Sequence, residues 1–156
     1  MSKYAKILVC VAVFLMAIAI LAVIYAYNKL EKSGEWSRSE TSIAGNKLHI
    51  YLADTEAKRE EGLSSFKGLS DQEGMLFLFD QAGNYQFWMK GMSMPIDIIW
   101  INNNKVIGIT PDIPVQTGAA DNELKKYAPP SEVDKVLEVR AGWTKKYGIE
   151  AGNNVE

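Results

Sequence analysis

Residues 95–110 read PIDIIWINNNKVIGIT, and this stretch gives the clearest indication of the fold class. Pro95 opens an apolar run from Ile96 to Ile101, three asparagines follow, and a second run extends from Lys105 to Thr110. Two short runs rich in β-branched residues and joined by turn residues are typical of a β-hairpin. We therefore predict an antiparallel hairpin here.

Similar short runs occur on both sides of this hairpin. They are residues 47–52, 75–79, 85–90 and 135–139. A short helix over 56–61 is expected because Asp54 and Thr55 can cap its start and Gly62 suits the position after its end. One or two helical turns and a short terminal strand are expected from Trp143 onward. We predict a mostly β fold, a compact sandwich or barrel of about six or seven short strands with one or two short helices.

The N-terminal region has a different character. Residues 7–27 contain no charged side chain and would span roughly 30 Å as a helix, enough to cross a bilayer. Tyr25 and Tyr27 stand where signal cleavage needs small residues, which favours an uncleaved transmembrane helix after a tail at 1–6.

The segment after this helix is polar and lacks apolar periodicity. We predict a linker at residues 28–43 and a single domain at 44–156. The short N-terminal tail resembles that of a signal anchor. The expectation is a single-pass protein of the cell membrane, with its domain outside the cytoplasm.

The amino-acid composition of the domain excludes some classes of function. Residues 44–156 carry 12 Lys and Arg against 16 Asp and Glu, the opposite of the basic excess that nucleic-acid binders need, so no nucleic-acid partner is predicted. The single cysteine, Cys10, lies in the apolar segment and gives the domain no disulfide or thiolate site. Familiar catalytic and phosphate-binding motifs are not recognisable. A binding module is therefore favoured over an enzyme, with no cofactor and no metal.

Four stretches carry a resemblance to a known family. They are ADT at 53–55 with Arg59 and Gly62-Leu63, EGMLFLF at 73–79, FWMK at 87–90 with MPIDIIWI at 94–101, and LEV at 137–139 with Ala141-Gly142. In this order and spacing they resemble the domain of unknown function 192 family, also called the UPF 0127 family, over roughly residues 46–155.

The resemblance implies a compact β-sandwich or barrel, often carried behind a signal or anchor, and it implies no agreed biochemical activity. Family members frequently have Leu-Met-x-Arg after the first glycine, where this chain has Leu63-Ser64-Ser65-Phe66. Any role of that second arginine is therefore not carried over. Members also often have Asn-Thr after the Trp-Met-Lys triplet, where this chain has GMS at 91–93.

Asp97 is the most informative polar residue. In a strand it shares one face with Ile99 and Ile101, and the opposite face is also apolar, so its carboxylate is expected to be at least partly buried. A buried carboxylate needs a partner, and the candidates are Arg59, Lys90 and neighbouring backbone amides. Asp97 could pin the hairpin to the helix, or it could contact a ligand at the mouth of a pocket.

We predict a ligand-binding cleft formed by Arg59, Trp88, Lys90 and Asp97. A carboxylate beside basic groups and an aromatic face suits a polar ligand with some flat surface, such as a small molecule, a glycan or a protein partner in the cell envelope. The enzymatic alternative is an acid–base hydrolase of envelope glycan that uses paired carboxyls such as Asp97 and Glu138. Otherwise Glu138 is expected to be a solvated or rim residue.

The spacing of Met89, Met92 and Met94 raises a second alternative, Cu(I) binding, because thioethers are soft ligands that select this ion. Met75 and His49 could add ligands. Packing competes with this interpretation, since methionine fills irregular gaps in apolar cores.

Overall fold

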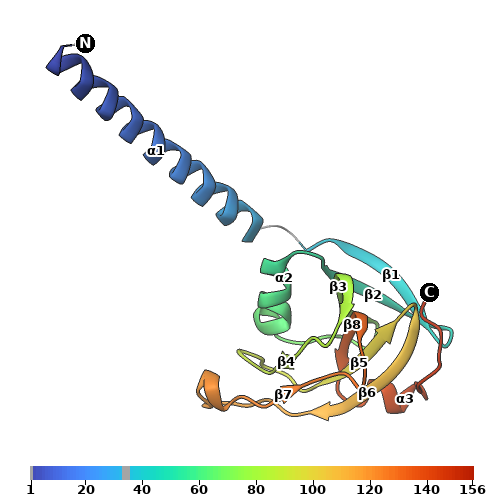
Figure 1. Cartoon of the computed structure of the whole chain (residues 1–156). Helices are drawn as coiled ribbons and strands as arrows, with labels where there is room; N and C mark the ends of the chain where they lie inside the picture. Colours follow the sequence, from blue (N-terminus) through green and yellow to red (C-terminus); the bar gives the residue numbers. More distant parts are fainter. Residues whose placement is uncertain (1, 33–35) are drawn as a thin grey trace. The chain divides into compact units, whose positions relative to one another are not determined.

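The computed structural model describes residues 2–32 and 36–156, and the chain divides into the units Met1–Glu35 and Trp36–Glu156 (Figure 1). The first unit contains helix α1 (Lys3–Lys32), in which Lys3–Tyr25 is long and apolar enough to cross a membrane. Its apolar side chains, for example Phe14, are exposed along this stretch. Within the predicted linker 28–43, residues 33–35 lie outside the described residues.

Six strands of the second unit form one mixed sheet. In spatial order they are β1 (Arg38–Ile43), β2 (Asn46–Ala53), β3 (Glu73–Gly83), β8 (Val133–Arg140), β5 (Ile96–Asn102) and β6 (Lys105–Ile113). Strands β2 and β3 are parallel, and the other neighbours are antiparallel. A separate two-stranded sheet consists of β4 (Phe87–Trp88) and β7 (Lys126–Tyr127). The mostly β prediction is confirmed, with eight strands in the described residues where six or seven were expected.

The predicted hairpin is the pair β5–β6. Its two-residue turn lies between Asn102 and Lys105, which are paired in register. The central residues Asn103 and Asn104 have φ values of 48° and 59°. Tight turns between twisted antiparallel strands need positive φ at both central positions, and asparagine tolerates that conformation better than most residues.

Strand β1 lies inside the stretch predicted to be a linker, so that prediction is wrong for residues 38–43. The sequence RSETSI has the polar composition of a linker because β1 is an edge strand with an exposed first half. Ala44 and Gly45, both with positive φ, turn the chain into β2. The domain therefore begins before residue 44.

Helix α2 (Glu56–Glu61) makes the crossover between the parallel strands β2 and β3. The Thr55 side chain accepts a hydrogen bond of 3.3 Å from the backbone N–H of Lys58, and Gly62 ends the helix with a φ of 49°. The predicted bounds and caps of this helix are confirmed. A 3-10 turn over Gly62–Ser65 follows.

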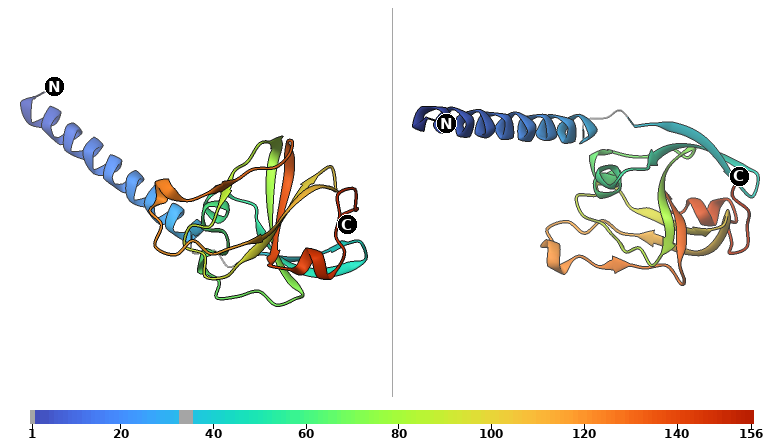
Figure 2. Two further views of the ribbon diagram at one scale, coloured as in Figure 1. Left: turned by 90° about the horizontal axis from the view of Figure 1, so that it is seen from below. Right: turned by 45° about the horizontal axis from the view of Figure 1, so that its top comes forward.

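Each face of the six-stranded sheet carries its own apolar core. The first core, on the face covered by α2 and the β4–β7 pair, includes Met75, Phe77, Ile98, Trp100 and Val136. The second core includes Leu76, Ile99, Ile101, Leu137, Val139 and Trp143 of helix α3 (Trp143–Lys146). Figure 2 shows α2 and α3 on opposite sides of the sheet. The central strands are thus buried on both faces.

The C-terminal residues join the two edges of the sheet. Ser42 of β1 exchanges two backbone hydrogen bonds of 2.9 Å with Glu156, and the N–H of Val155 donates to the carbonyl of Asn104 in the β5–β6 turn. The predicted terminal strand is present only as isolated β-bridges at Asn154 and Val155. These contacts draw β1 and β6 together, as in a partly closed barrel.

Candidate ligand-binding pocket

A cavity of about 600 Å³ opens on the face of the sheet that packs against α2. Its walls come from α2, the second half of β3, the segment 85–92 that contains β4, and β8. This volume lies in the range of about 300–1,000 Å³ that is typical of small-molecule sites.

Five aromatic side chains line the cavity. They are Phe77, Phe79, Tyr85, Phe87 and Trp88. Phe77 meets Phe87 edge to face with ring centroids 4.9 Å apart, while Phe79 and Tyr85 are stacked at 3.6 Å. Trp88 is 47% exposed, so about half of this residue is open to solvent. The aromatic wall therefore offers flat surface to an incoming molecule.

An interruption in strand pairing helps to shape this wall. Strand β3 pairs regularly with β8 from Gly74 to Leu78, and the register then shifts before pairing resumes at Gly83. Asp80 and Gln81 lie in the interrupted part and line the cavity. A bulge of this kind redirects side chains beside functional sites.

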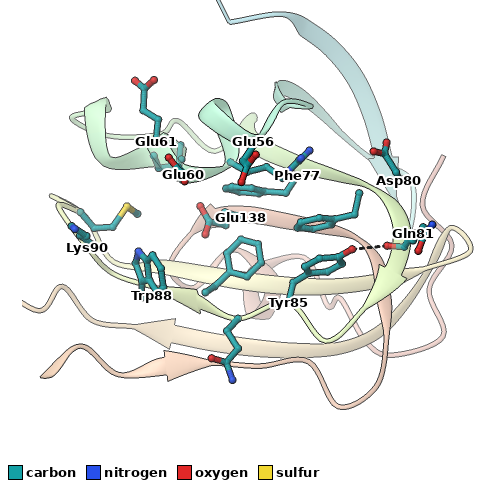
Figure 3. Close-up of a pocket in the computed structure, with 17 residues that line it drawn as sticks. Glu56, Glu60, Glu61, Phe77, Asp80, Gln81, Tyr85, Trp88, Lys90 and Glu138 are labelled. Atoms are coloured by element: carbon teal, nitrogen blue, oxygen red, sulfur yellow. Dashed lines mark hydrogen bonds between the residues drawn. The ribbon is translucent and has the colours of Figure 1, made fainter. Parts of the chain in front are cut away.

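Glu138 of β8 lies inside the cavity. It is 5% exposed, and it stands opposite Met75 of β3 and Ile98 of β5. Figure 3 shows its carboxyl between Glu56 and Glu60 on one side and Trp88 and Tyr85 on the other. Among the described residues, no side chain or backbone group forms a hydrogen bond or ion pair with this carboxyl.

Burial raises the pKa of Glu138 from 4.5 to about 8. Removing a carboxyl from water disfavours its charged form, and no neighbouring cation offsets that cost. At pH 7 the Glu138 carboxyl is therefore mostly neutral and can donate one hydrogen bond. A buried carboxyl with a raised pKa inside a cavity is a feature of functional sites.

The prediction that Glu138 is a solvated or rim residue is wrong. Polar and apolar residues alternate over part of residues 135–139, as in a strand with one solvent-exposed face. Strand β8, however, is central in the sheet and has an apolar core on each face. The available signal was Val136 next to Leu137, because apolar residues at adjacent positions point to both faces of a strand.

Three of the four predicted ligand-binding residues line the cavity, namely Arg59, Trp88 and Lys90. The Arg59 guanidinium donates a 2.8 Å hydrogen bond to the carbonyl of Leu78. The Lys90 ammonium pairs with Asp121, and the Lys90 side chain is half exposed. Their positions suit the predicted cleft, and their contact with a ligand stays a prediction.

Asp97 does not line the cavity, and of its candidate partners neither Arg59 nor Lys90 pairs with it. Its buried carboxylate accepts hydrogen bonds from the backbone N–H groups of Asp112, Gly142 and Thr144 at 2.8, 3.1 and 2.9 Å, and from the Thr144 hydroxyl at 2.6 Å. The predicted burial and the predicted role of backbone amides are confirmed. Asp97 thereby fastens β5 to a bulge in β6 and to the start of α3.

Asp97 and Glu138 lie on adjacent strands but face opposite sides of the sheet. Asp97 stands opposite Val139, whereas Glu138 stands opposite Ile98. Cross-strand partners share a face, and successive residues alternate between faces. These two carboxyls therefore cannot act together on one substrate, and the acid–base pair suggested by the sequence is excluded.

The methionines named as copper ligands belong to the first core. Met75, Met89, Met92 and Met94 are all buried in this cluster, and Met92 also lines the cavity. His49 is exposed on β2, where it lies beside Glu40. Apolar packing accounts for the four methionines, and Cu(I) binding stays a prediction.

Residues 39–156 match the domain of unknown function 192 family, which is described as an uncharacterized conserved group. The chain belongs to this family. No curated protein matches the sequence. The family membership confirms the resemblance seen in the sequence, and each of the four resembling stretches contributes a residue to the cavity wall: Arg59, Phe77, Trp88 and Glu138.

Two solved structures share the fold of this domain. One is a protein of Sinorhizobium meliloti 1021, described as a candidate transcription regulator. It is 25% identical to this chain with a TM-score of 0.70, and the match covers 79% of this chain and 97% of the Sinorhizobium chain. A second is a protein of unknown function from Novosphingobium aromaticivorans DSM 12444. It is 23% identical with a TM-score of 0.68, and the match covers 81% of this chain and 96% of the Novosphingobium chain.

Proposed function

We propose that this member of the domain of unknown function 192 family is a membrane-anchored binding module. Its cavity takes a ligand that has a flat apolar surface and a polar group. The observation that carries the proposal is the Glu138 side chain, which is 5% exposed and presents its carboxyl to a cavity walled by aromatic side chains, with no described protein group bonded to it. Desolvation makes the charged form of this carboxyl costly, and a ligand group that bonds to it recovers part of that cost. The aromatic wall would contribute the apolar contact.

The ligand in this proposal comes from the cell envelope rather than from nucleic acid. An excess of acidic residues in the domain opposes the binding of phosphate backbones. The description of the Sinorhizobium protein as a regulator is therefore not extended to this chain.

Ligand capture can be tested with Trp88→Ala. A panel of small aromatic compounds is screened by saturation-transfer NMR against the full chain in lipid nanodiscs. We expect compounds that bind the wild type to bind Trp88→Ala about tenfold more weakly, because loss of a stacking aromatic removes on the order of 1 kcal/mol or more.

The matched control is Trp36→Ala. Trp36 is also a partly exposed indole, but it packs against Phe66 and does not line the cavity. Its removal should leave binding of the same compounds unchanged. Equal binding to wild type and Trp88→Ala, or the same loss in both variants, would contradict the proposed site.

Membrane placement is supported by the apolar stretch Lys3–Tyr25 of α1. We propose that this helix anchors the chain with the domain outside the cytoplasm. A Cys10→Ser, Ala119→Cys variant carries a single cysteine in the exposed loop after β6. A membrane-impermeant maleimide should label it in intact cells, and labelling that occurs only after lysis would place the domain on the cytoplasmic side.

Glycan hydrolysis is a second candidate, favoured by one observation. Burial raises the pKa of Glu138 to about 8, and a carboxyl protonated at neutral pH can serve as a general acid. Asp80, which also lines the cavity, would be its partner carboxylate. Release of soluble fragments from isolated envelope glycan, lost in Glu138→Gln, would establish this activity, and no release by the wild type would exclude it.

A further inference from the structure

We infer that the cavity selects an organic cation, whose ammonium group meets the Glu138 carboxylate while its carbon skeleton contacts the aromatic wall. The inference rests on the proposed binding function and adds the chemical class of the ligand. It is carried by the charges, the burial and the wall composition of the cavity.

Carboxyl groups outnumber cationic groups around the cavity. The five carboxyl-bearing residues are Glu56, Glu60, Glu61, Asp80 and Glu138. Within the described part of the chain, none of the five belongs to an ion pair. Charges of one sign around a cavity with low-dielectric walls concentrate the field inside it, and this field attracts ligands of the opposite sign.

The two cationic side chains that line the cavity already have partners. Lys90 is paired with Asp121, which is not among the lining residues. Arg59 donates to the Leu78 carbonyl, and its guanidinium carbon lies 5.4 Å from the centroid of the Phe79 ring. Arg59 keeps its positive charge, because its hydrogen-bond partner is a neutral carbonyl. The carboxyl groups of the lining still outnumber its cationic groups, so the cavity favours a positive ligand over a negative one.

Glu138 gives this negative field a specific contact point. Unlike the carboxyls of α2, it is buried and lies against the sheet. A desolvated carboxylate gains most from a ligand that brings a positive charge and an N–H or polarised C–H group with it. An ammonium group held at Glu138 would supply the partner that the protein itself does not provide.

The aromatic wall distinguishes an organic cation from a metal ion. Cations bind over aromatic faces, and the effect is strongest where water is excluded. Phe77, Phe87 and Trp88 supply aromatic surface in the same cavity as Glu138, and the Lys126 ammonium already lies 5.8 Å from the centroid of the Trp88 ring. By contrast, no group of three or more His, Cys, Asp or Glu side chains in the described ranges could hold a metal ion.

Binding of a cation at Glu138 is coupled to loss of a proton. Burial holds the pKa of this carboxyl at about 8, so it must ionise before it can pair with the ligand at neutral pH. Affinity should therefore rise roughly tenfold per pH unit below pH 8 and level off above it. The other titratable side chains that line the cavity are Glu56, Arg59, Glu60, Glu61, Asp80, Tyr85 and Lys90.

Three probes of similar shape test the inference by calorimetric titration of the full chain in lipid nanodiscs. They are the cation phenethyltrimethylammonium, the neutral alcohol dimethylphenethylcarbinol and the anion hydrocinnamate. At pH 8 we expect the cation to bind about tenfold more tightly than the alcohol, and the anion to bind most weakly. The quaternary cation keeps its charge at every pH, so any pH dependence reports on the protein.

The variant Glu138→Gln keeps the shape of the side chain but removes its charge. It should bring the affinities for cation and alcohol to within about twofold of each other and abolish the rise with pH. Glu132→Gln, at an exposed position just before β8, is the matched control and should behave like the wild type.

The outcomes separate this inference from the proposed function. Equal affinity for cation and alcohol, or a cation preference that survives in Glu138→Gln, would overturn the inference. The proposed binding function would still be supported if the alcohol bound to the wild type and bound more weakly to Trp88→Ala. If none of the three probes bound at millimolar concentration, both the inference and the proposed function would fall.

Discussion

Replacing Asp97 with alanine is expected to destabilise the domain by about 3–5 kcal/mol. The change leaves the buried N–H groups of Asp112, Gly142 and Thr144 and the Thr144 hydroxyl without their acceptor. Each unsatisfied buried donor costs about 1–3 kcal/mol, less whatever water can replace. Urea unfolding of the full chain in nanodiscs, followed by the fluorescence of the buried Trp100 and Trp143, measures the loss.

Two further variants define what Asp97 contributes. Asp97→Asn keeps one oxygen for Asp112 and Gly142 but places an amide donor against the N–H of Thr144, so we expect a smaller loss than for alanine. Asp80→Ala removes an exposed carboxyl and should change stability little. A loss of less than about 1 kcal/mol for Asp97→Ala would contradict the fastening role.

Glu138→Gln is expected to stabilise the domain at high pH. The folded state holds the Glu138 proton up to a pKa of about 8, whereas the unfolded chain releases it near 4.5. The folded state therefore binds more protons between these values, and this contribution to stability is present in full below 4.5 and is lost as pH rises toward 8. Glutamine stays neutral throughout, so the variant avoids the cost of burying a charge.

The difference in unfolding free energy between Glu138→Gln and wild type should grow from near zero at pH 4.5 to about 3–5 kcal/mol at pH 8. Urea unfolding at a series of pH values measures it. Glu132→Gln should follow the wild-type curve at every pH. A constant offset between Glu138→Gln and wild type would mean that Glu138 does not keep its proton in the folded state.

Local patterns in the sequence predicted much of the fold. The three asparagines at 102–104 and the flanking apolar runs specify the β5–β6 hairpin, and Thr55 with Gly62 specifies α2. Strand β1 was missed because an exposed edge strand needs few apolar residues, and its composition therefore does not differ from that of a linker. The two-residue strands β4 and β7 are too short for a periodic pattern.

The site was predictable only in part, for reasons that depend on distance along the chain. Trp88 and Lys90 alternate on one short segment, so their common direction could be inferred. The partners of Asp97 were not predictable, since Gly142 and Thr144 contribute backbone amides from 45 and 47 positions away. Glu138 was misjudged because its burial follows from the central place of β8 in the sheet, which the strand alone does not reveal.

The proton held by Glu138 underlies the proposed pocket, its ligand class and the predicted pH dependence. The side-chain carboxyl carbon of Glu138 can be followed by ¹³C NMR across a pH titration, with Glu138→Gln identifying its resonance. A midpoint near pH 8 is the result we predict. A midpoint near 4.5, the ordinary value for a glutamate, would mean that this carboxyl is solvated or already partnered, and it would remove the basis for a cation site in this cavity.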